Sequence, residues 1–199
     1  LYLVTFLSSI PAYLLLTPML DNPDWMISTA PDTGVRLGLV LDLVNAQASY
    51  ATDGSTDNFT NFEQYYLTNQ ADTVLGSTGN DVVYSLGGDD TFYASVGNDT
   101  LNGGTGTDTL TYINATNGVA VDLSQTAAQN TGFGTVTVAG IENLTGSQSY
   151  GDVLTGSAVA NVIDGRGGND TIDGGTGIDT SGYSIASTAS AAMRPQAIA

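Results

Sequence analysis

The chain of 199 residues contains no histidine, no cysteine and no lysine, and its basic residues are Arg36, Arg166 and Arg194. Without histidine or cysteine it cannot form a Ser-His-Asp or Cys-His catalytic set, the usual kind of zinc site, or a disulfide. Its 20 acidic residues give a formal net charge of −17. Because nucleic acid is bound by clustered lysines and arginines, we expect no nucleic-acid partner.

Glutamate is almost absent too, since Glu63 and Glu142 are the only two and the other 18 acidic residues are aspartates. The chain also contains 25 glycines. Aspartate and glycine favour turns over helices, whereas the 41% of hydrophobic residues suffices for a buried core. We therefore expect an all-β body that is rich in turns and needs cations.

The first 20 residues differ from the rest because they carry no charge. A helix of that length would span about 30 Å, the thickness of the hydrocarbon layer of a bilayer. We predict an apolar helix over 1–20 that serves as a membrane helix, kinked near Pro11 and followed by Trp25 at the outer interface. The acidic remainder would then lie on the periplasmic or extracellular side. The alternative is an apolar segment that caps a soluble core.

The sequence from residue 39 onward is duplicated with an offset of 80, so that Asp72 corresponds to Asp152. Each copy begins with a predicted strand, at 39–43 and at 119–123. The predicted organisation is an apolar segment (1–20), a linker (21–38), a first copy (39–111), a second copy (112–182) and a C-terminal tail (183–199).

A shorter period of nine residues runs without a gap from residue 76 to residue 111. Position four is always glycine, position six is always aspartate and position eight is always apolar. Glycine permits the tight turn that positions one to six require, and positions seven to nine form a short strand. Two units make one coil of 18 residues, and stacked coils form a parallel β-roll, a β-solenoid with strands about 4.8 Å apart.

Stacking of these coils brings equal charges together. Asp81 and Asp99 are 18 residues apart, which places their carboxylates roughly 5 Å from each other and costs about 3 kcal/mol at an effective dielectric constant near 20. No basic residue lies in 76–111. Ca²⁺ takes six to eight oxygen ligands from carboxylates and carbonyls, so the sequence predicts calcium ions between the turns.

The segment Gly103–Thr111, GGTGTDTLT, resembles the GGxGxDxUx repeat of the RTX (repeats-in-toxin), hemolysin-type calcium-binding β-roll proteins. The phrase GIENLTGS over 140–147 is similar to the segment that leads into such repeats in serralysin-like C-terminal domains. The resemblance covers about 35–182. It implies several Ca²⁺ ions, each held between loops of adjacent coils by the position-six aspartates and by loop carbonyls.

Carried over to this sequence, the resemblance pairs the loop of Asp81 with that of Asp99, and the loop of Asp90 with that of Asp108. The second copy departs from the pattern at Asn161, which replaces an aspartate. The predicted metal-binding residues are Asp72, Gly79, Asp81, Gly88, Asp90, Gly97, Asp99, Gly106, Asp108, Asp152, Gly168, Asp170, Gly177 and Asp179.

Three functions are compatible with the sequence. The first is a non-catalytic calcium-binding module that folds outside the cytoplasm and has a structural or accessory role. The second is the C-terminal secretion or folding module of a type I-secreted enzyme, such as a protease, lipase or polysaccharide-modifying enzyme. The third is a membrane-anchored subunit that contacts other membrane subunits through 1–20. We expect no catalytic residues, and the single Asp32-Thr33-Gly34 tripeptide, which aspartic proteases carry twice, is a chance match.

Overall fold

A computed structural model describes residues 39–50, 56–58, 62 and 64–183. The predicted apolar helix over 1–20, the linker over 21–38 and most of the C-terminal tail lie outside this part of the chain. The described residues form β-strands and turns, and they include no helix that could cross a membrane. The expected all-β class is confirmed for them.

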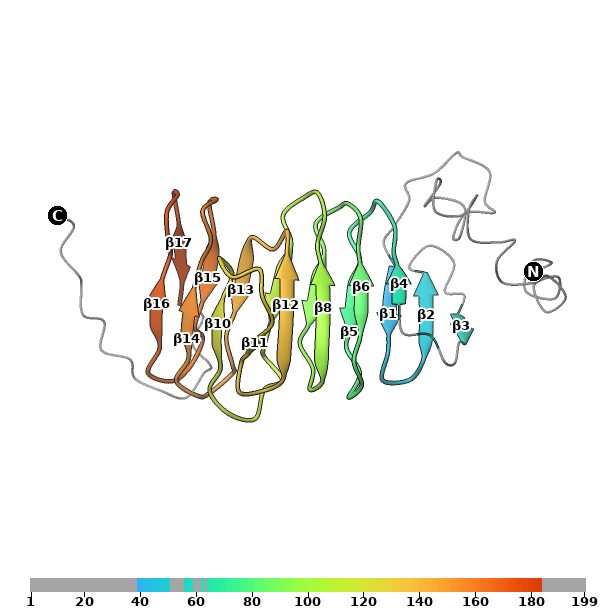
Figure 1. The fold of residues 1–199 in the computed structure, drawn as a ribbon, viewed down its shortest axis with the longest axis horizontal. Helices are drawn as coiled ribbons and strands as arrows, with labels where there is room; N and C mark the ends of the chain where they lie inside the picture. Colours follow the sequence, from blue (N-terminus) through green and yellow to red (C-terminus); the bar gives the residue numbers. More distant parts are fainter. Residues whose placement is uncertain (1–38, 51–55, 59–61, 63, 184–199) are drawn as a thin grey trace, which may run out of the picture.

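Short strands stand side by side along the longest axis of the molecule, with β1 (Leu39–Asp42) near one end and β17 (Thr180–Gly182) at the other (Figure 1). They form three sheets. The nine-stranded sheet consists, in spatial order, of β17, β15 (Val162–Asp164), β13 (Asn143–Thr145), β9 (Thr109–Thr111), β7 (Thr91–Tyr93), β5 (Thr73–Leu75), β1, β2 (Gln47–Tyr50) and β3 (Thr56–Asn58). The five-stranded sheet consists of β11 (Gln129–Asn130), β12 (Thr135–Ala139), β8 (Asn98–Asn102), β6 (Val82–Tyr84) and β4 (Gln64–Tyr66), and the three-stranded sheet of β10 (Ala120–Asp122), β14 (Val153–Thr155) and β16 (Thr171–Asp173).

Most strand pairs are parallel, and in the first copy each strand of the roll pairs with the strand two units further along the chain. Phe92 of β7 pairs with Leu110 of β9, and Val83 of β6 pairs with Leu101 of β8. Consecutive strands therefore alternate between two sheets, and two nine-residue units complete one coil. This arrangement is consistent with the predicted β-roll.

The core contains a row of apolar side chains, one from each of the strands β5 to β9 and β13 to β15, because alternate residues of a strand point to opposite sides. Position eight of every unit from 76 to 111 is buried, with exposed fractions between 0% and 6%. The row includes Val74, Val83, Phe92, Leu101, Leu110, Leu144, Leu154 and Ile163.

The regular stack is interrupted between β9 and β13. There the chain forms β10, β11 and β12, of which β12 pairs in parallel with β8 and β11 pairs antiparallel with β12. The buried side chain of Gln129 accepts a hydrogen bond from the Asp122 amide at 2.8 Å and donates one to the Asp122 carbonyl at 2.9 Å. The stack then resumes with Leu110 opposite Leu144. More than two repeat units separate these two partners, whereas two units separate Phe92 from its partner Leu110.

The strands that begin the two copies make the same contact. The Leu39 amide donates to Oδ1 of Asp72, and the Val119 amide donates to Oδ1 of Asp152 at 2.8 Å, both across 33 residues. The strands predicted at 39–43 and 119–123 are thus β1 and β10, each slightly shorter than expected. The duplication is therefore visible in the hydrogen bonds as well as in the sequence.

Candidate metal centre

The turns direct position six inward, immediately before a strand begins, except that Asp99 lies within β8. Because the apolar residue two positions later must reach the core, the position-six side chain lies on the same side of the chain. Six of the predicted aspartates are buried, whereas Asp170 is partly buried and Asp179 is exposed. The buried set is Asp72, Asp81, Asp90, Asp99, Asp108 and Asp152.

These aspartates form ladders that link successive coils. The Asp81 amide donates to Oδ1 of Asp99 at 3.0 Å, and the Asp90 amide donates to Oδ1 of Asp108 at 2.8 Å. Asp72 extends the second ladder, since its amide donates to Oδ1 of Asp90 at 2.7 Å. The structure therefore brings together the residue pairs that the sequence selected, and the same bond joins Asp152 to Asp170 at 3.0 Å. Their role as calcium ligands stays a prediction.

The position-four glycines allow the turns of neighbouring coils to approach closely. Gly97 and Gly106 have φ of +126° and +140°, a region that other residues rarely adopt. A Cβ on Gly106 would collide with the carbonyl oxygen of Gly88 in the preceding coil, and a Cβ on Gly97 would collide with that of Gly79. Backbone oxygens thus line the space between turns. Gly88, Gly168 and Gly177 share the positive φ, whereas Gly79 does not.

Glu142 is a ladder residue that the sequence analysis missed. Its Oε2 accepts a hydrogen bond from the Asp108 amide at 2.9 Å, so it occupies the place of a position-six aspartate. The repeat pattern does not reveal Glu142, because the interruption before β13 places it 34 rather than 18 positions after its partner Asp108. The spacing from Glu142 to Leu144 equals that from Asp108 to Leu110 and could have identified it.

Burial raises the pKa of several of these carboxylates. Burial raises the pKa of Asp90 to about 7, and the charges of Asp72 and Asp108 contribute to the rise. Burial likewise raises the pKa of Asp99 and of Asp108 to about 6. The pKa of Asp72 and that of Asp170 also rise, mainly through burial. A nearby cation would oppose each of these shifts, because it favours the charged carboxylate.

Among the residues that the structure describes, two buried carboxylate oxygens have no hydrogen-bond partner, namely Oδ2 of Asp90 and Oδ2 of Asp108. A buried, unpaired acceptor costs free energy and calls for an explanation. Within the described part of the chain, no three acidic side chains converge closely enough to hold a metal ion alone, so carbonyls would have to complete the coordination. Carboxylate oxygens beside backbone carbonyls are the donors that Ca²⁺ prefers, and these residues fit that ion.

Comparison with protein families agrees with this geometry. The family model for the RTX calcium-binding nonapeptide repeat (4 copies) matches residues 66–101, 75–110 and 140–180. The chain carries RTX calcium-binding nonapeptide repeats. No curated protein matches it. The matched RTX segments end at residue 110 and resume at residue 140, so the stretch that they leave out is the one in which β10, β11 and β12 interrupt the stack.

Proposed function

We propose that this RTX chain is a non-catalytic, calcium-binding β-solenoid that folds when it meets calcium outside the cytoplasm and serves a structural or accessory role. The observation that carries the proposal is the pair of buried oxygens, Oδ2 of Asp90 and Oδ2 of Asp108, that have no hydrogen-bond partner. A calcium ion between the two loops would bind both oxygens and would neutralise the charge of the stacked carboxylates.

In the described part of the chain, basic side chains are too few to neutralise the charge of the stacked carboxylates. Arg166 is the only basic residue there, and it lies in the second copy. RTX repeats bind calcium as a family, and the ion would be held by the position-six aspartates together with the carbonyls that the positive-φ glycines bring close.

The non-catalytic role rests on chemistry. The chain has no histidine, cysteine or lysine, and the buried aspartates are engaged in the ladders between coils. Anchoring in a membrane through 1–20, and service as the secretion module of a larger enzyme, depend on residues outside the described part and stay predictions from the sequence.

Circular dichroism of the full chain during a calcium titration tests the proposal. After removal of calcium by a chelator at neutral pH, we expect most of the β signal to be lost and calcium to restore it. Ligand that binds only the folded state stabilises it by RT ln(1 + [Ca²⁺]/Kd), about 2.7 kcal/mol at a hundredfold excess over Kd. Magnesium at equal concentration is the control. A spectrum that neither chelator nor calcium changes would overturn the proposal.

A further inference from the structure

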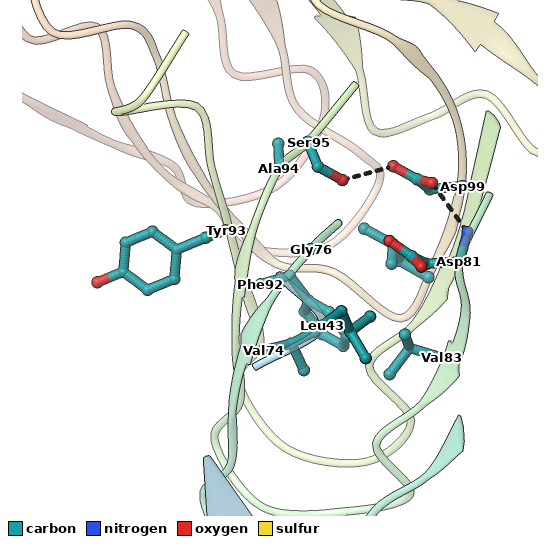
Figure 2. A pocket seen from close by; sticks show the side chains of 11 residues that line it. Leu43, Val74, Gly76, Asp81, Val83, Phe92, Tyr93, Ala94, Ser95 and Asp99 are labelled. Atoms are coloured by element: carbon teal, nitrogen blue, oxygen red, sulfur yellow. Dashed lines mark hydrogen bonds between the residues drawn. The ribbon is translucent and has the colours of Figure 1, made fainter. Parts of the chain in front are cut away.

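The aspartate loops of this chain leave their position-six carboxylates in two different states, and the residue at position two separates the Asp81–Asp99 pair from the Asp90–Asp108 pair. In the first class position two is serine or threonine. The Ser77 amide donates to Oδ2 of Asp81 at 2.9 Å, and the Ser77 hydroxyl donates to Oδ1 of Asp81 at 3.0 Å. The Ser95 hydroxyl donates to Oδ2 of Asp99 at 3.0 Å (Figure 2).

Figure 2 shows the consequence for this pair of loops. Asp81 and Asp99 face each other above the apolar side chains of the core, and Ser95 reaches Asp99 from the neighbouring segment. Both oxygens of each carboxylate accept a hydrogen bond within the chain. Ser77 donates to both oxygens of Asp81, whereas the Asp81 amide and the Ser95 hydroxyl each donate to one oxygen of Asp99. Each of these oxygens already has a donor without a cation.

Other loops share this device. The Thr68 hydroxyl and amide donate to Asp72 at distances from 2.9 to 3.0 Å. Ser147 makes the same contacts to Asp152 at 2.8 to 3.1 Å, but from position one, because it lies five rather than four residues before its aspartate. Position two is held by Ser157 before Asn161, where the Ser157 amide donates to Oδ1 of Asn161 at 2.7 Å. Serine and threonine suit this role, because their hydroxyls readily bond to groups nearby in the chain.

In the second class position two has no hydroxyl and adopts a positive φ. Leu86 has φ of +71° and Gly104 has φ of +85°, and they precede Asp90 and Asp108 by four residues. Oδ2 of each of these aspartates is the buried oxygen that lacks a partner. Arg166 and Gly175, with φ of +60° and +83°, hold the same position before Asp170 and Asp179.

Asn161 provides a third solution, which also avoids a cation. Its Nδ2 donates to the carbonyl of Glu142 at 2.6 Å, while its Oδ1 accepts from Ser157. A neutral amide thus supplies the donor that a carboxylate cannot. The loss of the aspartate at this position therefore leaves no buried oxygen or nitrogen of Asn161 without a partner.

We propose that, in the uninterrupted repeats over 76–111 of this RTX chain, position two decides whether a loop needs calcium. The Asp81–Asp99 pair accepts hydrogen bonds from Ser77 and Ser95 and binds no ion. The Asp90–Asp108 pair has Leu86 and Gly104 at position two and binds one ion. This inference rests on the proposed function and narrows it, because the repeat pattern alone assigns calcium to both pairs. The hydroxyls at position two donate hydrogen bonds to carboxylate oxygens that would otherwise bind the ion.

Asparagine substitutions in the full chain test the difference between the two pairs. Asn161 shows that the fold accommodates asparagine at position six. In isothermal titration calorimetry with CaCl₂, Asp108→Asn should bind one ion fewer per chain than the unaltered protein. Asp99→Asn should keep the full number of ions, although it removes an equivalent member of the repeat pattern.

A second pair of variants tests the role of the hydroxyls themselves. Ser77→Gly/Ser95→Gly reproduces at these loops the residue found at position 104, and it should increase the number of bound ions by one. Thr78→Gly/Val96→Gly adds the same two glycines one position further on, at exposed residues, and should leave the number of ions unchanged. Circular dichroism at saturating calcium verifies that each variant is folded.

The outcomes separate the two proposals. If the unaltered chain binds no calcium, the proposed function fails. If it binds calcium but Asp99→Asn loses an ion as Asp108→Asn does, or if the serine-to-glycine double variant gains none, the proposed function stands and the role of position two is wrong.

Discussion

The backbone amide of Asp90 donates to Oδ1 of Asp108 at 2.8 Å. The carboxylate of Asp108 thus accepts a hydrogen bond from the equivalent aspartate of the preceding coil. Repeated along the stack, this bond aligns the carboxylates in columns. The alignment is what makes the stack unfavourable when all aspartates are charged. It is also what presents their remaining oxygens to a cation.

The first prediction concerns pH in the absence of calcium. The pKa of Asp90 rises from 3.8 to about 7, and those of Asp99 and Asp108 rise to about 6. Because the folded state then binds protons more tightly than the unfolded state, this contribution to stability is fully present below pH 3.8 and is lost as pH rises through about 6 to 7. In chelator, circular dichroism should therefore show a thermal transition at pH 5 with a higher Tm than any transition that remains at pH 8.

The control for this prediction is the same experiment with saturating calcium. Calcium binds the deprotonated carboxylates and competes with protons, so the order of the two Tm values should reverse. Asp90→Asn should flatten the dependence seen in chelator. A Tm in chelator that increases from pH 5 to pH 8 would contradict the assignment of raised pKa values.

The second prediction concerns two glycines that the repeat pattern treats as equivalent. Gly106→Ala should destabilise the calcium-loaded protein by about 1–3 kcal/mol, because Gly106 has φ of +140° and its Cα faces the Gly88 carbonyl. Gly79→Ala should change stability by less than about 1 kcal/mol. Among the described residues, a Cβ there would meet only the Ser77 hydroxyl oxygen, at 3.4 Å. Urea denaturation measures both, and equal losses would be inconsistent with this difference.

The sequence was sufficient to predict the repeating part of the fold. Its period of nine, with glycine, aspartate and an apolar residue at fixed positions, gives the coil of two units and identifies Val83, Phe92, Leu101 and Leu110 as core residues. These features follow from local chemistry, since each unit has the same turn and the same inward side chain. The pairs of aspartates follow from the same register.

The interruption and its effects could not be predicted in this way. The places of β10, β11 and β12 depend on contacts between distant residues, such as the bonds from Gln129 to Asp122, and no local period encodes them. Glu142 was missed for this reason. Gly106 has a positive φ and Gly79 does not, a difference that the repeat pattern does not state.

The third prediction tests the core. Leu110 is fully buried, and Leu110→Ala should lower the free energy of unfolding in saturating calcium by about 2–5 kcal/mol. Ile178→Ala is the matched control, because Ile178 is 88% exposed and its truncation should change stability by no more than about 0.5 kcal/mol. Similar effects of the two substitutions in urea denaturation would argue against a core that runs through position eight.

The fourth prediction concerns Glu142, the residue that takes the place of an aspartate after the interruption. Its charge contributes, after burial, to the raised pKa of Asp108, and the charge of Asp89 does so less. Glu142→Gln keeps an oxygen that can accept from the Asp108 amide but removes the charge. In calcium-free protein at acidic pH, where the first prediction favours folding, the pKa of Asp108 should fall from about 6 towards 3.8. Titration of the carboxyl ¹³C resonances by NMR measures this, with Asp89→Asn as a control that should produce a smaller fall. If Glu142→Gln left the pKa of Asp108 unchanged while Asp89→Asn lowered it, Glu142 would not be part of the ladder that faces Asp108.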